Sequence, residues 1–341
     1  MILHNKINGE ELKKKLLSNN EPRTTISFYK YHHIQDPKAF RDQMFIDFSK
    51  LEVLGRIYIA EEGINAQISV PSRNYELLRT VIYSIEFLNG IRLNIAVDDN
   101  GKSFFKLAIK VKSKIVADGI LDKKFDVTKI GTHLKAQEYN DLLNSKEVVV
   151  VDMRNHYESE VGHFENAILP DVDTFREQLP YVANLLADKK EQAIVMYCTG
   201  GIRCEKASAY MLHKGFKEVY QLEGGIIEYA KQVKANGLEN KFHGKNFVFD
   251  ERLSESISDD VIAKCHQCGE PFDVHTNCAN VACNLLFIQC PSCKEKFNNC
   301  CSEACKTIAA LPEDEQKLLR KGKNFGRLVF KKGRKLKTIS T

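Results

Sequence analysis

The first part of the chain combines strands of alternating pattern with amphipathic helices. Four segments alternate apolar and polar positions as strands do: residues 25–31, 55–60, 64–70 and 91–97. Two segments have a helical period, residues 37–53 and 73–87, and a further extended segment covers residues 104–116. Their β-α-β-β-α-β order predicts a split, ferredoxin-like sandwich as an N-terminal domain over residues 1–125.

From residue 131 onward, helices and buried strands alternate along the chain. The predicted helices are residues 135–144, 174–187, 204–214 and 225–235, and the predicted strands are residues 147–151, 193–197 and 218–222. This alternation indicates a doubly wound, parallel α/β domain over residues 131–237. Loops at the carboxyl ends of such strands usually carry the functional site.

The rest of the chain has three parts. Residues 238–262 form a connector, and its Phe247-Val248-Phe249 sequence indicates that it packs against a neighbour. Residues 263–310 form a small cysteine-rich module, and residues 311–341 form a basic tail after a helical stretch at residues 306–320. No internal repeat or low-complexity block interrupts this organisation.

Composition and charge exclude several classes of protein. With 341 residues, 43% hydrophobic and 28% charged, the chain is typical of a multidomain globular protein. No run reaches the ~18 apolar residues of a membrane helix, and the N-terminus lacks the apolar core of a signal peptide. We therefore expect a cytoplasmic protein with no membrane partner.

The net charge of +5 depends on one segment. Residues 317–337 contain ten Lys or Arg and no Asp or Glu, so the remainder has 40 basic residues against 45 acidic ones. A basic segment on a slightly acidic protein is expected to bind phosphates, as in RNA, although lysine-rich tails also serve only to keep proteins soluble.

Nine of the eleven cysteines lie between residues 265 and 305. Their pairwise spacing in a chain without a signal peptide favours zinc over disulfides. Eight thiolates would hold up to two structural zinc ions: Cys265, Cys268, Cys278, Cys283, Cys290, Cys293, Cys301 and Cys305. Spacing leaves open whether Cys300 replaces Cys301, whether His266 or His275 replaces a thiol, and whether the pairs bind sequentially or in a cross-brace. Unliganded thiols or disulfides are the alternative.

A cysteine loop follows the predicted strand 193–197. Cys198 precedes two glycines, Arg203 and a segment of good helix propensity, so its sulfur is expected among backbone N–H groups that favour negative charge. Gly200 and Gly201 let the backbone curl so that amides point inward. A thiol in such electropositive surroundings is expected to be reactive.

This loop resembles the active-site loop of rhodanese-type domains. Further resemblance lies upstream in residues 150–154 (VVDMR), Glu158 and residues 162–167 (GHFENA), and downstream in residues 222–226 (LEGGI). The resemblance implies that Cys198 is the catalytic nucleophile, which would carry a persulfide. It also implies an active-site loop made of Thr199, Gly200, Gly201, Ile202 and Arg203.

Several neighbouring residues are weaker candidates. Cys204 stands where many rhodaneses have Ser or Thr, and it is either a second thiol that resolves an oxidised Cys198 or a small buried side chain. Arg154 is a candidate substrate contact, although Asp152 and an Arg two residues later usually form a structural ion pair. His163, in a turn, is expected to be scaffold.

Longer strings extend the resemblance over nearly the whole chain. They are residues 60–66 (AEEGINA), 197–206 (YCTGGIRCEK), 246–252 (NFVFDER), 278–280 (CAN) and 300–302 (CCS). In this three-module order the chain is similar to the bacterial tRNA uridine(34) hydroxylases. The resemblance implies hydroxylation of the wobble uridine at C5, giving 5-hydroxyuridine, with molecular oxygen as co-substrate. No flavin or nicotinamide fingerprint is evident in the sequence.

The implied partner is the anticodon arm of tRNA, and no obligatory protein partner is evident. The first domain and the tail would clamp the arm, with Phe28, Tyr29 and Tyr31 either stacked on bases or buried in the core. Cys198 would either add to C6 of the uracil, making C5 nucleophilic, or carry a persulfide or oxidised sulfur that activates oxygen. The alternatives are a sulfurtransferase that moves persulfide sulfur to an acceptor such as tRNA, and a zinc-dependent adaptor without catalysis.

Overall fold

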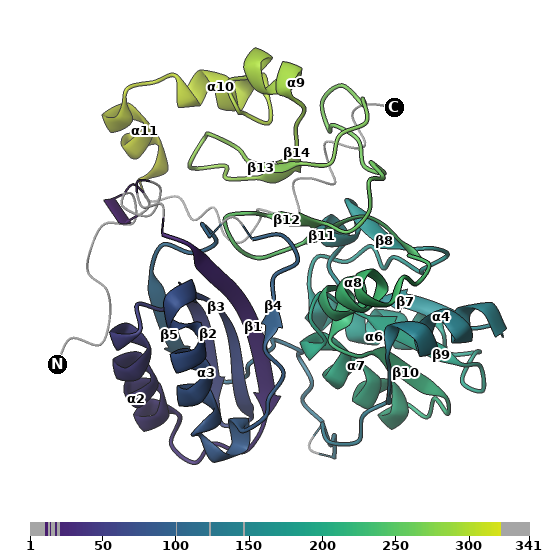
Figure 1. Cartoon of the computed structure of the whole chain (residues 1–341). Coiled ribbons are helices and arrows are strands. Elements are labelled where there is room, and N and C mark those ends of the chain that lie inside the picture. The colour runs from purple at the N-terminus through teal and green to yellow at the C-terminus, as the bar shows by residue number, and fades with distance from the viewer. Residues whose placement is uncertain are drawn as a thin grey trace.

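The first domain is a five-stranded sheet with two α-helices on one face (Figure 1). The computed structural model describes residues 11, 12, 14, 18, 21–99, 101–122, 124–145 and 147–321. The elements of this domain are β1 (Arg23–Tyr31), α2 (Pro37–Lys50), β2 (Leu54–Ala60), β3 (Gly63–Pro71), α3 (Tyr75–Tyr83), β4 (Asn94–Ile95) and β5 (Leu107–Val111). The order β4-β1-β3-β2 confirms the ferredoxin-like sandwich, and β5 lies parallel to β2 at the edge.

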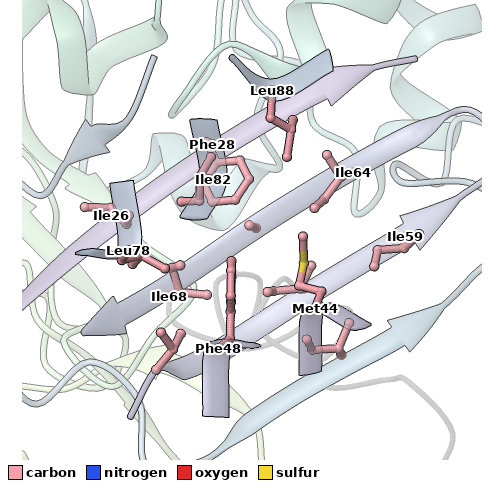
Figure 2. Packing of buried hydrophobic residues seen from close by; sticks show 14 of the residues in the cluster. Ile26, Phe28, Met44, Phe48, Ile59, Ile64, Ile68, Leu78, Ile82 and Leu88 are labelled. Carbon is pink, nitrogen blue, oxygen red and sulfur yellow. The ribbon is translucent and has the colours of Figure 1, made fainter. Parts of the chain in front are cut away.

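Alternation along the strands separates the two faces of this sheet. Figure 2 shows Ile26 and Phe28 of β1 packed with Met44 and Phe48 of α2 in the core. Phe28 is therefore a core residue, and its expected alternative role of stacking on a base is wrong. The intervening side chains of β1 lie on the face without helices, because successive residues of a strand point to opposite faces.

Two predicted elements of the first domain are shorter than expected. The helix predicted over residues 73–87 consists of α3 between two 3₁₀ turns, Ser72–Asn74 and Glu86–Leu88, because Ile85 adopts an extended backbone. The strand predicted over residues 91–97 keeps only the two residues of β4, which pair with β1.

The second domain is built on a parallel four-stranded sheet of order β6-β10-β9-β7. Its elements are β6 (Thr132–Leu134), α4 (Ala136–Ser145), β7 (Val149–Asp152), α5 (His156–Ser159), β8 (Gly162–Phe164), α6 (Phe175–Leu185), β9 (Ile194–Tyr197), α7 (Ile202–His213), β10 (Val219–Leu222) and α8 (Gly225–Asn236). Along β9, Ile194 and Met196 enter one core cluster while Val195 and Tyr197 enter the other. Burial on both faces confirms the predicted doubly wound domain.

The connector is not a free linker. Its strand β11 (Phe242–Phe247) pairs with β8 of the second domain and with β12 (Ser254–Ser256). Phe247 is buried and meets Tyr157 edge-on, with ring centroids 5.3 Å apart. The expectation that this segment packs is confirmed, and the connector extends the second domain by two strands.

The C-terminal module contains β13 (His275–Asn277), β14 (Leu286–Ile288), α9 (Pro291–Lys296), α10 (Glu303–Ala309) and α11 (Glu313–Arg320). The helical stretch predicted over residues 306–320 is two helices, because Pro312 cannot continue α10 and instead precedes α11. Most of the predicted basic tail, residues 322–341, lies outside the described residues. Among those that are described, no helix has the length and apolar character required to span a bilayer.

A buried ion cluster joins the first two domains. Lys206 of α7 is 1% exposed, and its Nζ lies 2.8 Å from both carboxylate oxygens of Glu62 in the β2–β3 turn. Lys206 also pairs with Asp118, a buried residue of the segment that follows β5. Because the cysteine loop precedes α7 directly, this cluster fixes the loop relative to the first sheet.

We predict that Lys206→Met lowers the free energy of unfolding by about 3 kcal/mol, because Glu62 would lose its cation and the buried Asp118 would keep only Lys114. Urea unfolding followed by circular dichroism measures the change. Lys214→Met, at the exposed end of the same helix, is the matched control and is expected to have little effect. Equal unfolding midpoints for Lys206→Met and the wild type would contradict the assignment.

Candidate functional site

A cavity of about 410 Å³ lies between the helix-free face of the first sheet and the loop after β9. Cys198, Thr199, Gly200, Ile202 and Arg203 of this loop line one wall. The opposite wall includes Thr25, Ser27 and Tyr29 of β1, Asn65 and Gln67 of β3, and Asn94 of β4. Connector residues from Val248 to Glu255 close a third side. The cavity therefore requires contributions from the first domain, the second domain and the connector.

The backbone of the loop surrounds the sulfur of Cys198. Cys198 is 0% exposed, and the amide of Gly201 donates a hydrogen bond to its Sγ over 3.2 Å. Gly201 has a φ of 99°, and a Cβ there would lie 2.6 Å from the hydroxyl of Tyr29. Gly225 has a φ of 66°, and a Cβ there would lie 2.4 Å from the carbonyl oxygen of Cys198. Both positions therefore require glycine.

Arg203 is held by Glu158, a buried residue of the short helix α5. Two parallel hydrogen bonds of 2.6 and 2.8 Å join the guanidinium to the carboxylate, and Arg203 also donates to the hydroxyl of Thr199 over 3.3 Å. A bidentate pair of this kind fixes both position and orientation. In the sequence Glu158 is recognisable only as part of a motif, and the fold makes it the partner of Arg203.

The environment of Cys198 favours the thiolate. Burial alone would raise the pKa of Cys198, but the thiol of Cys204, the charge of Arg203 and the backbone amides of Cys204 and Gly201 outweigh it and lower the pKa to about 6. These groups act on the charged form by hydrogen bonding and by proximity of opposite charge. At neutral pH the sulfur is therefore mostly a nucleophilic thiolate.

Cys204 lies in the first turn of α7, buried beside Cys198. Burial, together with the hydrogen bond to Cys198 and its negative charge, raises the pKa of Cys204 well above the usual thiol value. Cys204 thus keeps its proton and donates it in a hydrogen bond to the Cys198 thiolate. Whether Cys204 also resolves an oxidised Cys198 stays a prediction.

Arg154 does not face the cavity. It is 0% exposed, pairs with Asp152 over 2.6 Å, and donates to the carbonyl oxygen of Gly162 over 2.6 Å. Arg154 is not among the residues that line the cavity, and its guanidinium lies inside the second domain, so nothing in the cavity geometry supports the predicted role of substrate contact. The expected ion pair with Asp152 is confirmed. His163 lies in strand β8 rather than in a turn, and its Nδ1 is 3.1 Å from the carbonyl oxygen of Phe164.

Tyr29 and Tyr31 connect the first sheet to the loop rather than to the core. The hydroxyl of Tyr29 donates to Glu205 over 3.1 Å, and that of Tyr31 donates to the carbonyl of Ile202 over 3.2 Å. Glu205 also bonds to His133 over 3.0 Å, and this hydrogen bond raises the pKa of His133. No local signal in the sequence pairs residues so distant along the chain.

The eight predicted ligand cysteines gather in two separate groups. One group is Cys265, Cys268, Cys290 and Cys293, and the other is Cys278, Cys283, Cys301 and Cys305; within each group the Sγ atoms lie within 4.8 Å of one another. In sequence order, the pair Cys265/Cys268 combines with Cys290/Cys293, and the pair Cys278/Cys283 combines with Cys301/Cys305. This alternating arrangement is a cross-brace. All eleven cysteines are free thiols, and Cys300 lies outside both groups.

Neither histidine of the module belongs to a cysteine group. His266 contacts Glu160 of the second domain over 2.9 Å, and His275 packs edge-on against Phe247 with ring centroids 5.2 Å apart. Two sets of four thiols fit tetrahedral zinc, the geometry that structural zinc adopts with cysteine ligands. Each group therefore supplies the four ligands of a tetrahedral site without a histidine.

Three family profiles match the chain in order. They are the UPF0176 acylphosphatase like domain over residues 23–115, the Rhodanese-like domain over residues 135–232, and Rhodanase C-terminal over residues 243–306. A rhodanese-like domain from Anabaena is 19% identical and covers 34% of this chain and 80% of that chain, with a TM-score of 0.27.

Curated relatives match the chain along almost its full length. The tRNA uridine(34) hydroxylase of Photorhabdus laumondii is 58% identical over 98% of this chain and 95% of that protein. Proteins of the same name from Cronobacter sakazakii and Escherichia fergusonii are 58% and 57% identical, each over 98% of this chain and over 96% and 95% of their own lengths.

We predict that the Cys198 thiol titrates with a midpoint near pH 6 and that Cys204→Ala raises this midpoint by about one unit, because a hydrogen bond to the charged form is lost. The ultraviolet thiolate absorbance, taken as the difference from Cys198→Ser, measures the titration. Cys300→Ser is the control and is expected to leave the midpoint unchanged. A Cys204→Ala midpoint equal to that of the wild type would show that Cys204 does not stabilise the thiolate.

Proposed function

The chain belongs to the tRNA uridine(34) hydroxylase family, and we infer from this membership that it is a tRNA-modifying enzyme that hydroxylates the wobble uridine. Near full-length identity of 57–58% to proteins of that name is the observation that carries the inference. The sulfurtransferase alternative is not favoured, although the rhodanese-like domain accounts for the resemblance to that class.

The substrate uridine is proposed to enter the cavity between the first sheet and the cysteine loop. A volume of about 410 Å³ falls in the range of sites that hold small molecules and single nucleotides. Bases of an anticodon loop are unpaired and can be turned out of their stack into a protein pocket. The anticodon arm is therefore the proposed binding region, with the basic residues 317–337 as its electrostatic partner.

Cys198 is the proposed nucleophile. Its thiolate would form a bond to C6 of the uracil, and the electron pair of the C5–C6 double bond would become available at C5 for bonding to molecular oxygen. Two cellular thiol groups would then be oxidised to a disulfide, and the two electrons and two protons that they supply would leave a hydroxyl group at C5 and release water. Loss of the C5 proton and cleavage of the S–C6 bond would restore the double bond and the free thiolate.

Surrounding groups have supporting roles in this proposal. Arg203, fixed by Glu158, and the amide of Gly201 hold negative charge on the sulfur before attack and again when it leaves. Cys204 stays protonated and positions the thiolate. A persulfide on Cys198 that activates oxygen remains the second mechanism, and it predicts a mass adduct on protein isolated without reductant.

The C-terminal module is proposed to hold two zinc ions, one in each cysteine group. Four thiolates leave no open coordination position, so the metal would supply folding energy and no catalysis. The module packs on the connector through a shared cluster that contains Phe247 and Ile288. Bound zinc would therefore stabilise the connector, which forms the third wall of the cavity, without taking part in the reaction.

We predict that Cys198→Ser reduces 5-hydroxyuridine formation by about a thousandfold or more, because the oxygen nucleophile is far weaker than a thiolate at neutral pH. Purified tRNA lacking the modification is treated with enzyme, oxygen and a thiol, and its nucleosides are measured by liquid chromatography–mass spectrometry. Cys300→Ser is the matched control. Full activity of Cys198→Ser would refute the nucleophilic role, and thiolated nucleosides in place of hydroxylated ones would favour the sulfurtransferase.

We predict two zinc ions per chain by elemental analysis, and one in Cys278→Ser, because one ligand set loses a thiolate. Cys300→Ser is expected to keep both ions, since Cys300 lies outside both groups. Removal of zinc by a chelator should lower the melting temperature. A zinc content that is unchanged in Cys278→Ser would contradict the assignment of this group.

A further inference from the structure

Asn94 lies on the wall of the cavity that faces the cysteine loop. It belongs to β4 and pairs with Ser27 of β1, so the two side chains share the helix-free face of the sheet. A Cβ added to Gly200 would lie 3.9 Å from the Nδ2 of Asn94 and 4.0 Å from the hydroxyl of Ser27. The carboxamide of Asn94 therefore lies directly opposite the loop that begins with Cys198.

The Oδ1 atom of Asn94 has no hydrogen-bond partner within the part of the chain that the structure describes, although the residue is only 4% exposed. An unpaired buried carbonyl destabilises a protein, and such groups are rare in native structures, so its place on the wall of this cavity points to a partner in the substrate. Asn155 and Glu255 also line the cavity with an unpaired oxygen, but each is engaged elsewhere. Asn155 donates to Tyr157, and Glu255 accepts from Arg252.

We propose that the carboxamide of Asn94 recognises the substrate base by accepting a hydrogen bond from N3–H of the uracil at Oδ1 and donating one to the adjacent O4 from Nδ2. This inference rests on the proposed function and names the group that selects the base. A carboxamide supplies one acceptor beside two donors, which matches the N3–H and O4 edge of uracil. Enzymes that act on extruded bases commonly recognise this edge.

The position of Asn94 fits the chemistry proposed for Cys198. In a uracil ring, N3 and C6 lie on opposite sides, so a group bonded to N3–H must lie across the ring from the nucleophile. Asn94 and Cys198 line the same cavity from opposite walls. Cytosine has no proton on N3 at neutral pH, so it would leave Oδ1 unpaired as long as the carboxamide keeps the orientation in which Nδ2 faces Gly200. A site built for a hydrogen bond rejects an analogue that lacks it.

The test combines a substrate change with a protein change. Wild type and Asn94→Ala are each assayed on tRNA carrying uridine or 3-methyluridine at position 34, and kcat/KM for 5-hydroxylation is measured by mass spectrometry. We expect methylation to lower kcat/KM of the wild type by about tenfold to a hundredfold and that of Asn94→Ala by less than about threefold. Each factor is the ratio of kcat/KM for uridine to kcat/KM for 3-methyluridine on the same protein. A smaller fraction of folded enzyme lowers both values equally and leaves the ratio unchanged.

Asn65→Ala is the matched control. Asn65 lines the same cavity, but its Nδ2 donates to the carbonyl of Ile115 over 3.4 Å. The factor by which methylation lowers kcat/KM is expected to be the same for this variant as for the wild type. An equal factor in Asn94→Ala, or no effect of methylation on the wild type, would overturn the inference alone. A wild-type enzyme that leaves unmodified uridine 34 unchanged would overturn the proposed function, and this inference with it.

Discussion

A buried thiolate must be compensated, and the structure around Cys198 depends on that requirement. Removing a charge from water is unfavourable, so a sulfur at 0% exposure keeps its charge only if fixed dipoles and cations surround it. The Gly201 amide, the Cys204 thiol and Arg203 provide this environment. Arg203 in turn depends on Glu158 for its position, so α5, the loop and the start of α7 act as one electrostatic unit.

The cavity depends on docking of the first domain against this unit. One face of the first sheet is apolar and packs on its own helices, while the other presents hydroxyl and carboxamide groups to the loop. Lys206, Glu62 and Asp118 form buried ion pairs at this boundary, and Tyr29 and Tyr31 add hydrogen bonds to α7. Charges that are desolvated together resist separation, so they set the distance between the two walls.

The cysteine-rich module lies against the second domain and the connector in Figure 1, and its contacts explain why the connector is ordered. Lys245 of β11 pairs with Asp273 over 2.8 Å, and Glu160 contacts His266 over 2.9 Å. A module this small has little core of its own, so ligand-held cysteines would keep these surfaces in place. The connector, which forms the third wall of the cavity, is thereby supported by the cysteine-rich module.

The sequence alone determined what depends on neighbours in the chain. Period-two and helical patterns predicted both sheets, glycines after a strand predicted the Cys198 loop, and cysteine spacing predicted eight ligands. Local signals could not supply what a distant contact decides: the burial of Arg154 against Gly162, the partner of Arg203 at Glu158, and the way the cysteine pairs combine into two groups. Tertiary structure alone placed Asn94 opposite Gly200, because strand register and domain docking, rather than sequence distance, bring those residues together.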